Sequence, residues 1–218
     1  MALAIFDLDN TLIAGDSDDL WGEFMAANGL VETETFREGN NRFYEQYKQG
    51  VMDIREYLDF SLQPLTQLTL DELEAWHGRF MEQQIAPILL KKGREQIEIH
   101  RQQGDHIMII TATNRFVTAP IAKEFEVDTL LAIDLEIQDN RYTGKVIGTP
   151  TYQQGKVTRL QEWLNEHPEH TMAGCYFYSD SKNDLPLLKR VDNPVAIDPD
   201  PDLEKFATAN GWQITSFR

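Results

Sequence analysis

Two carboxylates separated by one residue follow the first apolar run of the chain. Asp7 and Asp9 come directly after Leu3-Ala4-Ile5-Phe6, a run that predicts a buried strand ending at a polar turn. Alternate residues of an extended chain lie on one face, roughly 6–7 Å apart. Two negative charges at that spacing need a cation or a proton between them. The pair therefore predicts a divalent-metal site, or one ionised and one protonated carboxylate. A solvated strand end or a helix cap is the ordinary alternative.

Later polar residues occupy the same position relative to their strands. Thr111 ends a predicted strand over 106–111, and Asp180 and Asp184 follow a strand over 172–179. From about residue 87 strands alternate with helices, beginning with a helix over 88–103, and Asp139-Asn140 marks a hairpin. This order predicts an α/β fold with a mostly parallel, doubly wound sheet. Ligands of such sheets bind outside the carboxyl ends of the strands, so we expect the active site there.

These side chains have the chemical types that phosphoryl transfer needs. A carboxylate such as Asp7 is the nucleophile where a covalent aspartyl-phosphate forms. Asp9 could protonate the leaving alcohol and then deprotonate the attacking water. Asp180 and Asp184 add oxygen ligands, and an oxygen-only set suits Mg²⁺. The alternative role of Asp184 is to cap a short helix.

Two further groups could hold an anion at this place. Thr111 offers a hydroxyl and Ala112 a backbone N–H at a strand-to-helix turn, which together make a small anion cradle. The alternative is that Thr111 only caps the next helix. Lys156 begins a helix, where its charge opposes the helix dipole. Lys156 could therefore balance a phosphate and a carboxylate, although most lysines are merely solvated. The spacing of His167 and His170 does not match a zinc site.

Composition limits the classes of partner. The 218 residues carry 36 acidic and 20 basic side chains, a net charge of −16. This balance argues against nucleic acid and anionic membranes as partners. No stretch approaches the roughly 20 apolar residues of a membrane span, and we see no signal peptide. The single Cys175 is expected to fill the core in a reducing compartment, so we expect a cytoplasmic protein.

A helical segment separates the first strand from the alternating region. Residues 16–86 predict four amphipathic helices, and two of them start with the capping patterns Asp16-Ser17-Asp18-Asp19 and Thr69-Leu70-Asp71-Glu72. The aromatic side chains of these helices are expected in the core. The length fits one large domain, or one domain with a sizeable insertion.

Together these residues resemble the four motifs of the haloacid dehalogenase-like (HAD) hydrolases. In chain order the motifs are Asp7-Leu8-Asp9-Asn10-Thr11, Ile110-Thr111-Ala112-Thr113, Lys156 and Ser179-Asp180-Ser181-Lys182-Asn183-Asp184. The resemblance covers essentially the whole chain and points to subfamily IB, the phosphoserine-phosphatase-like branch. It implies a Rossmann-like core of residues 1–15 and 87–218 and a helical C1 cap of residues 16–86. The segments Ala14-Gly15 and Ala86-Pro87 would be the hinges of cap closure.

The resemblance also implies Mg²⁺-dependent phosphoryl transfer with a role for each motif. Asp7 would be the nucleophile, and Asp9 the acid and base that phosphatases of this superfamily have and dehalogenases lack. The phosphoryl group would be held by Thr111, Ala112 and Lys156. The metal site would comprise Asp7, Asp9 through its backbone carbonyl, Asp180 and, in support, Asp184. Asn183 would help to orient Asp184 or the metal-bound waters.

Two motifs depart from the pattern of the family. Ser179 stands where the fourth motif usually has glycine, which affects only the fine geometry because the acids are intact. Thr111-Ala112-Thr113 stands where phosphoserine phosphatases typically have Ser-Gly-Gly. Because of the second departure, the resemblance is weaker support for the same substrate in this chain.

The cap must supply substrate specificity. In phosphoserine phosphatases an acid nine residues after the nucleophile binds the substrate ammonium, and that position is Asp16 here, with a helix cap as its alternative role. Arg42 and Arg55 are candidates to bind a substrate carboxylate. The run Gly15-Asp16-Ser17-Asp18 and Trp21 also resemble relatives that act on histidinol phosphate. We therefore expect a small amine-bearing phosphate monoester, histidinol phosphate or phosphoserine.

Three alternatives stay open at this point. The chain could be a receiver-like or phosphate-binding module that is phosphorylated on Asp7 and turns over slowly, although Asp9 and the large cap argue against it. It could transfer the phosphoryl group to another alcohol instead of water. It could be a monomer or a homodimer.

Overall fold

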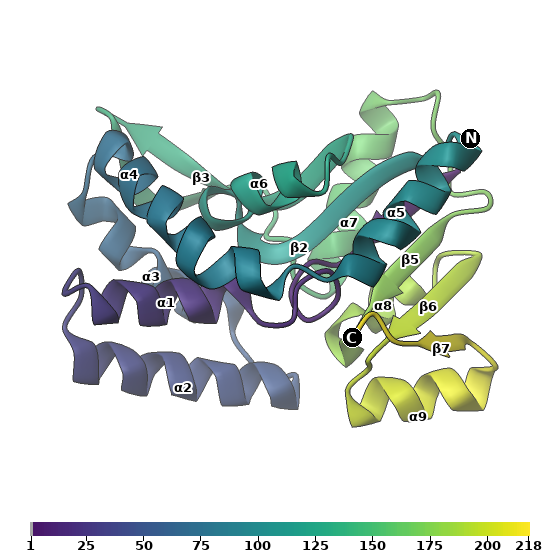
Figure 1. Ribbon diagram of the computed structural model, residues 1–218, viewed down its shortest axis with the longest axis horizontal. Helices are drawn as coiled ribbons and strands as arrows, with labels where there is room; N and C mark the ends of the chain where they lie inside the picture. The colour runs from purple at the N-terminus through teal and green to yellow at the C-terminus, as the bar shows by residue number, and fades with distance from the viewer. Residues whose placement is uncertain (1) are drawn as a thin grey trace.

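A seven-stranded sheet organises the computed structural model, which describes residues 2–218 (Figure 1). The strand order within these residues is β4-β3-β2-β1-β5-β6-β7. Every neighbouring pair is parallel except β3 and β4, which form the hairpin around Asp139-Asn140. The predicted doubly wound α/β sheet is confirmed. The strands are β1 (Leu3–Phe6), β2 (His106–Asn114), β3 (Thr129–Gln138), β4 (Arg141–Ile147), β5 (Tyr176–Ser179), β6 (Asn193–Ile197) and β7 (Gln213–Thr215).

Alternation of side chains along β1 builds a core on each face of the sheet. Ala4 and Phe6 belong to the core on one face, and Leu3 and Ile5 to the core on the other, and all four are fully buried. The first face is covered by α5 (Lys91–Gln103) and α6 (Arg115–Glu124). The second is covered by α7 (Gln154–Glu166), α8 (Leu185–Leu188) and α9 (Pro201–Asn210). Helices on both faces bury β1 completely, which explains its continuous apolar sequence.

The four predicted helices between β1 and α5 form the group drawn at the left of Figure 1. The Asp16 carboxylate caps the first by accepting from the backbone N–H groups of Asp18 and Asp19. Thr69 and Glu72 form the predicted capping box of the fourth. The helices are α1 (Ser17–Ala27), α2 (Thr33–Gln49), α3 (Ile54–Ser61) and α4 (Leu70–Phe80).

The two connections between these helices and the sheet lie side by side. A π-helical turn (Met81–Ile85) and a 3₁₀ turn (Ala86–Ile88) follow α4. The backbone N–H of Leu90 then donates to the carbonyl of Leu12 at 3.0 Å, and that of Ala14 donates to Ile88 at 2.8 Å. Because these residues pair with the other connection, the helix expected from Ile88 begins only at Lys91.

Two predicted strand boundaries are wrong for local reasons. The strand β2 does not end at Thr111 but continues to Asn114, whose side chain accepts from Val117 N–H at 3.1 Å and caps α6. The strand β5 begins at Tyr176 instead of residue 172, since the Cys175 N–H closes a turn onto the Met172 carbonyl at 3.1 Å. Cys175 itself is a free, fully buried thiol, as expected of a core residue.

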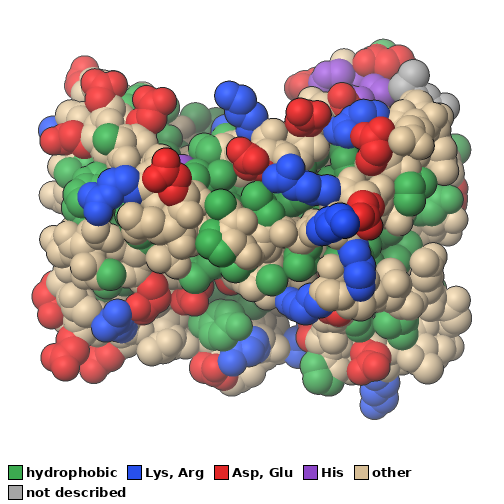
Figure 2. Space-filling model, viewed as in Figure 1, with side chains coloured by type: hydrophobic (Ala, Val, Ile, Leu, Met, Phe, Trp, Pro, Cys, Tyr) green, Lys and Arg blue, Asp and Glu red, His purple; other side chains and the backbone are tan. Residues whose placement is uncertain are grey.

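The surface reflects the acidic composition. Figure 2 shows Asp and Glu side chains distributed over the whole of one face, with Lys and Arg interspersed among them. Within residues 2–218, no helix combines the length and the apolar character that crossing a bilayer would require.

Candidate active site

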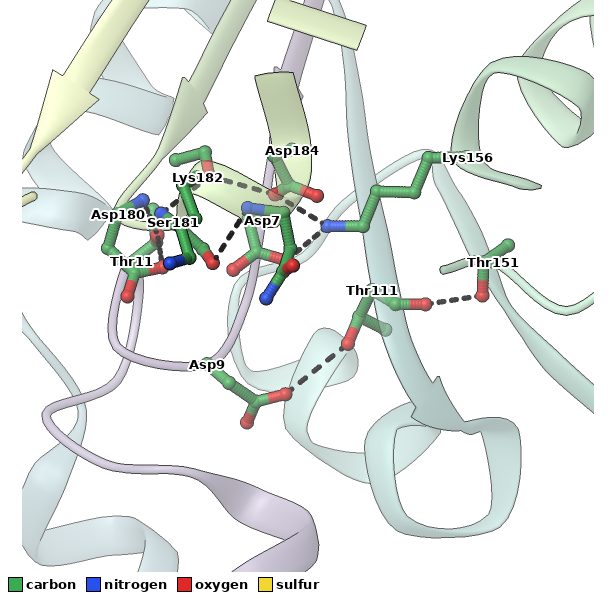
Figure 3. A network of polar contacts seen from close by, with 12 residues as sticks. Asp7, Asp9, Thr11, Thr111, Thr151, Lys156, Asp180, Ser181, Lys182 and Asp184 are labelled. Carbon is green, nitrogen blue, oxygen red and sulfur yellow. Dashed lines mark hydrogen bonds and ion pairs between the residues drawn. The ribbon is translucent and has the colours of Figure 1, made fainter. Parts of the chain in front are cut away.

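A buried trio of charged side chains lies where β1 and β5 end (Figure 3). The Lys156 ammonium is 2.7 Å from Asp7 Oδ1 and 2.7 Å from Asp184 Oδ2. The Ser179 hydroxyl donates to the same Asp184 oxygen at 2.8 Å. Lys156, from the first turn of α7, is therefore fixed between two carboxylates that come from two different strand ends. Its solvated alternative is excluded, because the residue is only 2% exposed.

Burial and neighbouring charges set the protonation of the trio. Burial raises the pKa of Asp7 to about 7; Lys156 opposes this shift, and Asp184 and Asp9 add to it. Burial alone would lower the pKa of Lys156, but Asp184 and Asp7 outweigh it, so the net shift is upward. The ammonium stays charged, whereas Asp7 needs one more nearby cation to be fully ionised at neutral pH.

Asp180 adds a third carboxylate with little compensation. Its side chain accepts from the Thr11 hydroxyl at 3.2 Å, and its own N–H donates to that hydroxyl at 3.1 Å. Burial, followed by the charges of Asp7 and Asp184, raises the pKa of Asp180 well above its ordinary value. Within residues 2–218, Asp180 has no lysine contact of its own, because Lys156 pairs only with Asp7 and Asp184. The three carboxylates therefore carry an excess of negative charge that a divalent cation would relieve.

The available ligands fit Mg²⁺. The strand ends offer carboxylate and carbonyl oxygens, which are the donors that this ion prefers. Among residues 2–218, no three acidic, His or Cys side chains converge into a ready-made cage. Mg²⁺ does not require one, since it usually takes one or two carboxylates and completes its shell with water and phosphate oxygens.

Asp9 has entirely different partners from Asp7. One of its oxygens accepts from the Ser17 N–H at the start of α1 at 2.7 Å. The other accepts from the hydroxyls of Thr113 at 3.0 Å and Thr111 at 3.3 Å. The Thr111 side chain therefore faces Asp9, as Figure 3 shows, and does not cap α6. The sequence reasoning missed Thr113, although alternation along β2 places it on the same side as Thr111.

A cavity opens between these strand ends and the helices α1 to α3. Asp16 lines it while its carboxylate also caps α1, so both roles considered for this residue are compatible. Of the described residues, no lysine or arginine lines the cavity. Arg42 and Arg55 are exposed, and the Arg42 guanidinium lies over the Phe43 ring. The cavity is lined by Asp7, Asp9, Asp16, Asp18, Asp19, Asn40, Phe43, Tyr44, Tyr47, Met52, Tyr57, Ala112 and Thr113.

Two further acids line the cavity, Asp18 and Asp19. From the sequence, Asp19 was assigned only to a helix-capping pattern, and Asp18 to that pattern and to the run that resembles relatives acting on histidinol phosphate. Asp18 accepts from the Tyr57 hydroxyl and, at 3.4 Å, from the Asn114 amide, so it joins α1, α3 and β2. Burial, with help from Asp9 and Asp19, raises the pKa of Asp18 to about 6, although the Tyr57 hydrogen bond opposes the shift. Asp19 accepts from the Asn40 amide of α2. The density of acids in this first turn was the signal that sequence reasoning could have used.

The Asn183 side chain makes its hydrogen bonds to residues other than Asp184. Its amide nitrogen donates to the Tyr47 carbonyl of α2 at 3.0 Å. Its amide oxygen accepts from Gln153 at 3.1 Å and from the Tyr152 hydroxyl at 3.4 Å. The side chain therefore joins α2 to the segment that precedes α7 and makes no hydrogen bond to Asp184.

Comparison with known proteins agrees with this geometry. Residues 4–189 match the family model of the haloacid dehalogenase-like hydrolases. A histidinol-phosphatase of Neisseria meningitidis is 42% identical over 99% of each chain. A phosphoserine phosphatase of Mycobacterium tuberculosis is 30% identical, over 100% of this chain and 71% of its own length.

Solved structures show the same fold. A protein of unknown function from Bordetella pertussis superposes with a TM-score of 0.93 at 40% identity, over 100% of this chain and 99% of its own. A phospho-aspartyl intermediate analogue of phosphoserine phosphatase superposes with a TM-score of 0.72 at 18% identity, over 100% of this chain and 93% of its own. At 18% identity the second likeness concerns the fold alone.

Proposed function

Because the chain belongs to the haloacid dehalogenase-like hydrolases and is a phosphatase of that family, we propose that it hydrolyses a small amine-bearing phosphate monoester through a phosphorylated Asp7. The observation that carries this proposal is that Asp7, which belongs to the buried trio, also lines an acidic cavity. The trio provides a nucleophile and a cation for the phosphoryl group. The cavity provides partners for a positively charged leaving group.

The proposed reaction has two steps that use the same two carboxylates. Asp7 attacks phosphorus, and the bond to the leaving alcohol breaks as Asp9 gives that alcohol a proton. Asp9 then takes a proton from water, which attacks the aspartyl-phosphate and releases phosphate and free Asp7. The contacts of Asp9 with Ser17 and Thr113 hold its carboxyl group in position for both transfers.

The remaining motif residues would bind the phosphoryl group and the metal. Lys156, the Thr111 hydroxyl and the Ala112 N–H are proposed to hold phosphoryl oxygens. Mg²⁺ would be held by Asp7, the Asp9 carbonyl and Asp180, while Asp184 keeps Lys156 in place. When bound, the ion would neutralise charge on the phosphoryl oxygens.

We further propose that residues 1–15 and 87–218 act as the core and residues 16–86 as a C1 cap. The paired connections at Ala14-Gly15 and Ala86-Pro87 are the proposed hinges between the two parts. We also propose a reducing compartment such as the cytoplasm, where the single buried Cys175 would stay a thiol.

The lining of the cavity favours histidinol phosphate over phosphoserine as the substrate. Asp16, Asp18 and Asp19 can face an ammonium or an imidazolium, and both groups occur in histidinol phosphate. The carboxylate of phosphoserine would meet these acids without an arginine partner among the described lining residues. An uncompensated charge in a buried site costs about 3–5 kcal/mol. The identity of 42% with a histidinol-phosphatase supports the same choice.

Phosphate release from a panel of esters tests this proposal. The panel holds histidinol phosphate, phosphoserine, a sugar phosphate and p-nitrophenyl phosphate, each with Mg²⁺ and with EDTA. We expect Mg²⁺-dependent release and a kcat/KM for histidinol phosphate at least about a hundredfold above that for phosphoserine. Preference for phosphoserine would overturn the substrate, and stoichiometric phosphorylation without turnover would overturn the phosphatase.

A further inference from the structure

The end of α2 contacts the core at one small group of residues, which we name the cap–core junction: Tyr47, Gly50, Tyr152, Gln153 and Asn183. The Gln153 side-chain amide lies at its centre. Its nitrogen is 3.4 Å from the Gly50 carbonyl, 3.1 Å from Asn183 Oδ1 and 3.1 Å from the Tyr152 hydroxyl. The Asn183 amide in turn donates to the Tyr47 carbonyl at 3.0 Å. One amide of the core therefore reaches both the cap and the residue beside Asp184.

Gln153 has a backbone conformation that side chains rarely adopt. Its φ of +47° and ψ of −116° belong to a region that is favourable only for glycine. Such a conformation persists where the surrounding structure holds it, and it is concentrated at functional sites. A glycine here would remove the strain, but it would also remove the amide from the cap–core junction.

The position of Gln153 connects this contact to the buried trio. Gln153 immediately precedes α7, which carries Lys156 in its first turn. Asn183 immediately precedes Asp184, and Lys156 and Asp184 are 2.7 Å apart. The two core residues that anchor the cap thus lie within three residues of Lys156 and Asp184 in the sequence. Tyr47, from the other side of the junction, lines the substrate cavity.

From these contacts we propose that Gln153 is a positioning residue for the phosphatase reaction. It holds the end of α2 against the core, which keeps Tyr47 and Met52 over the cavity while the leaving group is bound. The inference rests on the proposed function, because it assigns this contact to leaving-group binding. It predicts a selective defect: esters that the cap recognises lose more than esters that it does not.

The test compares Gln153→Gly with Gln154→Gly, a matched change of the same residue type at the next position, where the side chain is exposed. For Gln153→Gly we expect kcat/KM for histidinol phosphate to fall ten- to a hundredfold, mainly through KM. Activity on p-nitrophenyl phosphate should stay within threefold of the wild type, because that ester lacks the groups the cap binds. Gln153→Glu keeps the shape but loses the donor, so it should show the same selectivity.

Two further measurements separate positioning from simple loss of structure. The thermal midpoint of Gln153→Gly should equal or exceed that of the wild type, since glycine adopts this backbone conformation freely. Hydrogen exchange of the amides of residues 46–53, measured without substrate, should accelerate at least fivefold in Gln153→Gly and remain unchanged in Gln154→Gly.

Several results would overturn the inference. These are unchanged exchange in Gln153→Gly, an equal loss of activity on both esters, or an equal effect of Gln154→Gly. Wild-type protein that releases phosphate from no ester would contradict the proposed function, whereas the exchange experiment would still decide whether Gln153 holds the end of α2.

Discussion

At the residue scale, the surroundings of two neighbouring carboxylates separate their chemistry. Asp7 faces the ammonium of Lys156 at 2.7 Å, whereas Asp9 faces the hydroxyl of Thr113 and the N–H of Ser17. A carboxylate beside a fixed cation is suited to attack phosphorus. In the described part of the chain Asp9 contacts no fixed cation, and its neutral donors fix the orientation of its carboxyl group, as a group that transfers protons requires. The proposed roles of the two residues follow from these partners.

Replacement of Asp7 by asparagine should remove turnover while the fold is retained. The amide is isosteric, and Lys156 keeps its contact with Asp184. Loss of the nucleophile should lower kcat by on the order of 10⁵. Phosphate release and circular dichroism check the two halves of this expectation, and substantial residual activity would exclude Asp7 as the nucleophile.

The matched comparison is Asp9→Asn with p-nitrophenyl phosphate. Nitrophenolate is a good leaving group and needs no acid, so Asp7 should still be phosphorylated. The second step, which needs a base for water, should slow by about 10²–10⁴. Intact-mass spectrometry after acid quenching should find one phosphoryl group on Asp9→Asn and none on Asp7→Asn.

Asp18 should contribute to substrate selection. Exchange of its charge for an amide in Asp18→Asn keeps an acceptor for the Tyr57 hydroxyl. A lost charge-assisted contact of about 1.5–3 kcal/mol corresponds to a rise of KM for an amine-bearing ester of roughly ten- to a hundredfold. Because the pKa of Asp18 is raised to about 6, the wild type should show the same rise in KM as the pH falls below 6.

Steady-state kinetics between pH 5 and 8 check this expectation, with Asp59→Asn as the control. Asp59 is an exposed acid of α3 outside the cavity. Equal KM values for Asp18→Asn and the wild type at pH 7.5 would remove Asp18 from the binding site.

At the element scale, local signals predicted the helices but not the segments that join them. Asp16, Asp53 and Thr69 cap three of the helices because short polar side chains satisfy free N–H groups locally. By contrast, the late start of α5 depends on two backbone hydrogen bonds, one between Leu90 and Leu12 and one between Ala14 and Ile88. That pairing is a long-range property, which no local pattern contains.

Gly155 should be indispensable to the start of α7. A Cβ at this position would lie 1.9 Å from the Pro150 carbonyl oxygen, a backbone atom that cannot yield easily. Gly155→Ala should therefore displace the first turn of α7 with Lys156, lower the free energy of unfolding by about 3 kcal/mol and reduce activity more than tenfold.

Gly78→Ala is the matched control for this substitution. Gly78 lies exposed within α4, and a Cβ there meets no atom within 4 Å. Alanine should stabilise that helix by roughly 0.5–1 kcal/mol and leave activity unchanged. Urea unfolding measures the free energy of unfolding of both variants. If Gly155→Ala were as stable as the wild type, Gly155 would not be required for the start of α7.

At the scale of the whole molecule, the sequence predicted only indirectly which distant residues lie close together in space. The rule that ligands bind at the carboxyl ends of parallel strands brought Asp7, Thr111 and Asp184 together correctly. The rule does not specify side-chain direction, so the contact of Asn183 with α2 was not foreseen. The rule also says nothing about the proposed cap, where Asp19 was interpreted only as part of a helix-capping pattern and Asp18 was assigned no contact of its own.

Metal binding and pH should be linked through the buried acids. Burial raises the pKa of Asp7 from its ordinary 3.8 to about 7, and that of Asp180 also rises. Between about pH 4 and 7 Asp7 ionises in the unfolded chain but stays largely protonated in the metal-free fold, and the raised pKa of Asp180 acts in the same direction. Their contribution therefore favours folding at low pH and is lost as the pH rises through 7.

The stabilisation by Mg²⁺ should consequently grow with pH. Protons compete with Mg²⁺ for Asp7 and Asp180, so excess Mg²⁺ should raise the unfolding midpoint little at pH 5 and most at pH 8. The lowered pKa values of His77 and His106 produce an opposite trend in stability itself. That trend cancels when midpoints with Mg²⁺ and with EDTA are compared at each pH. Asp180→Asn should abolish the rise in unfolding midpoint that Mg²⁺ causes. A rise of equal size at pH 5 and pH 8 would mean that Mg²⁺ does not bind through these carboxylates.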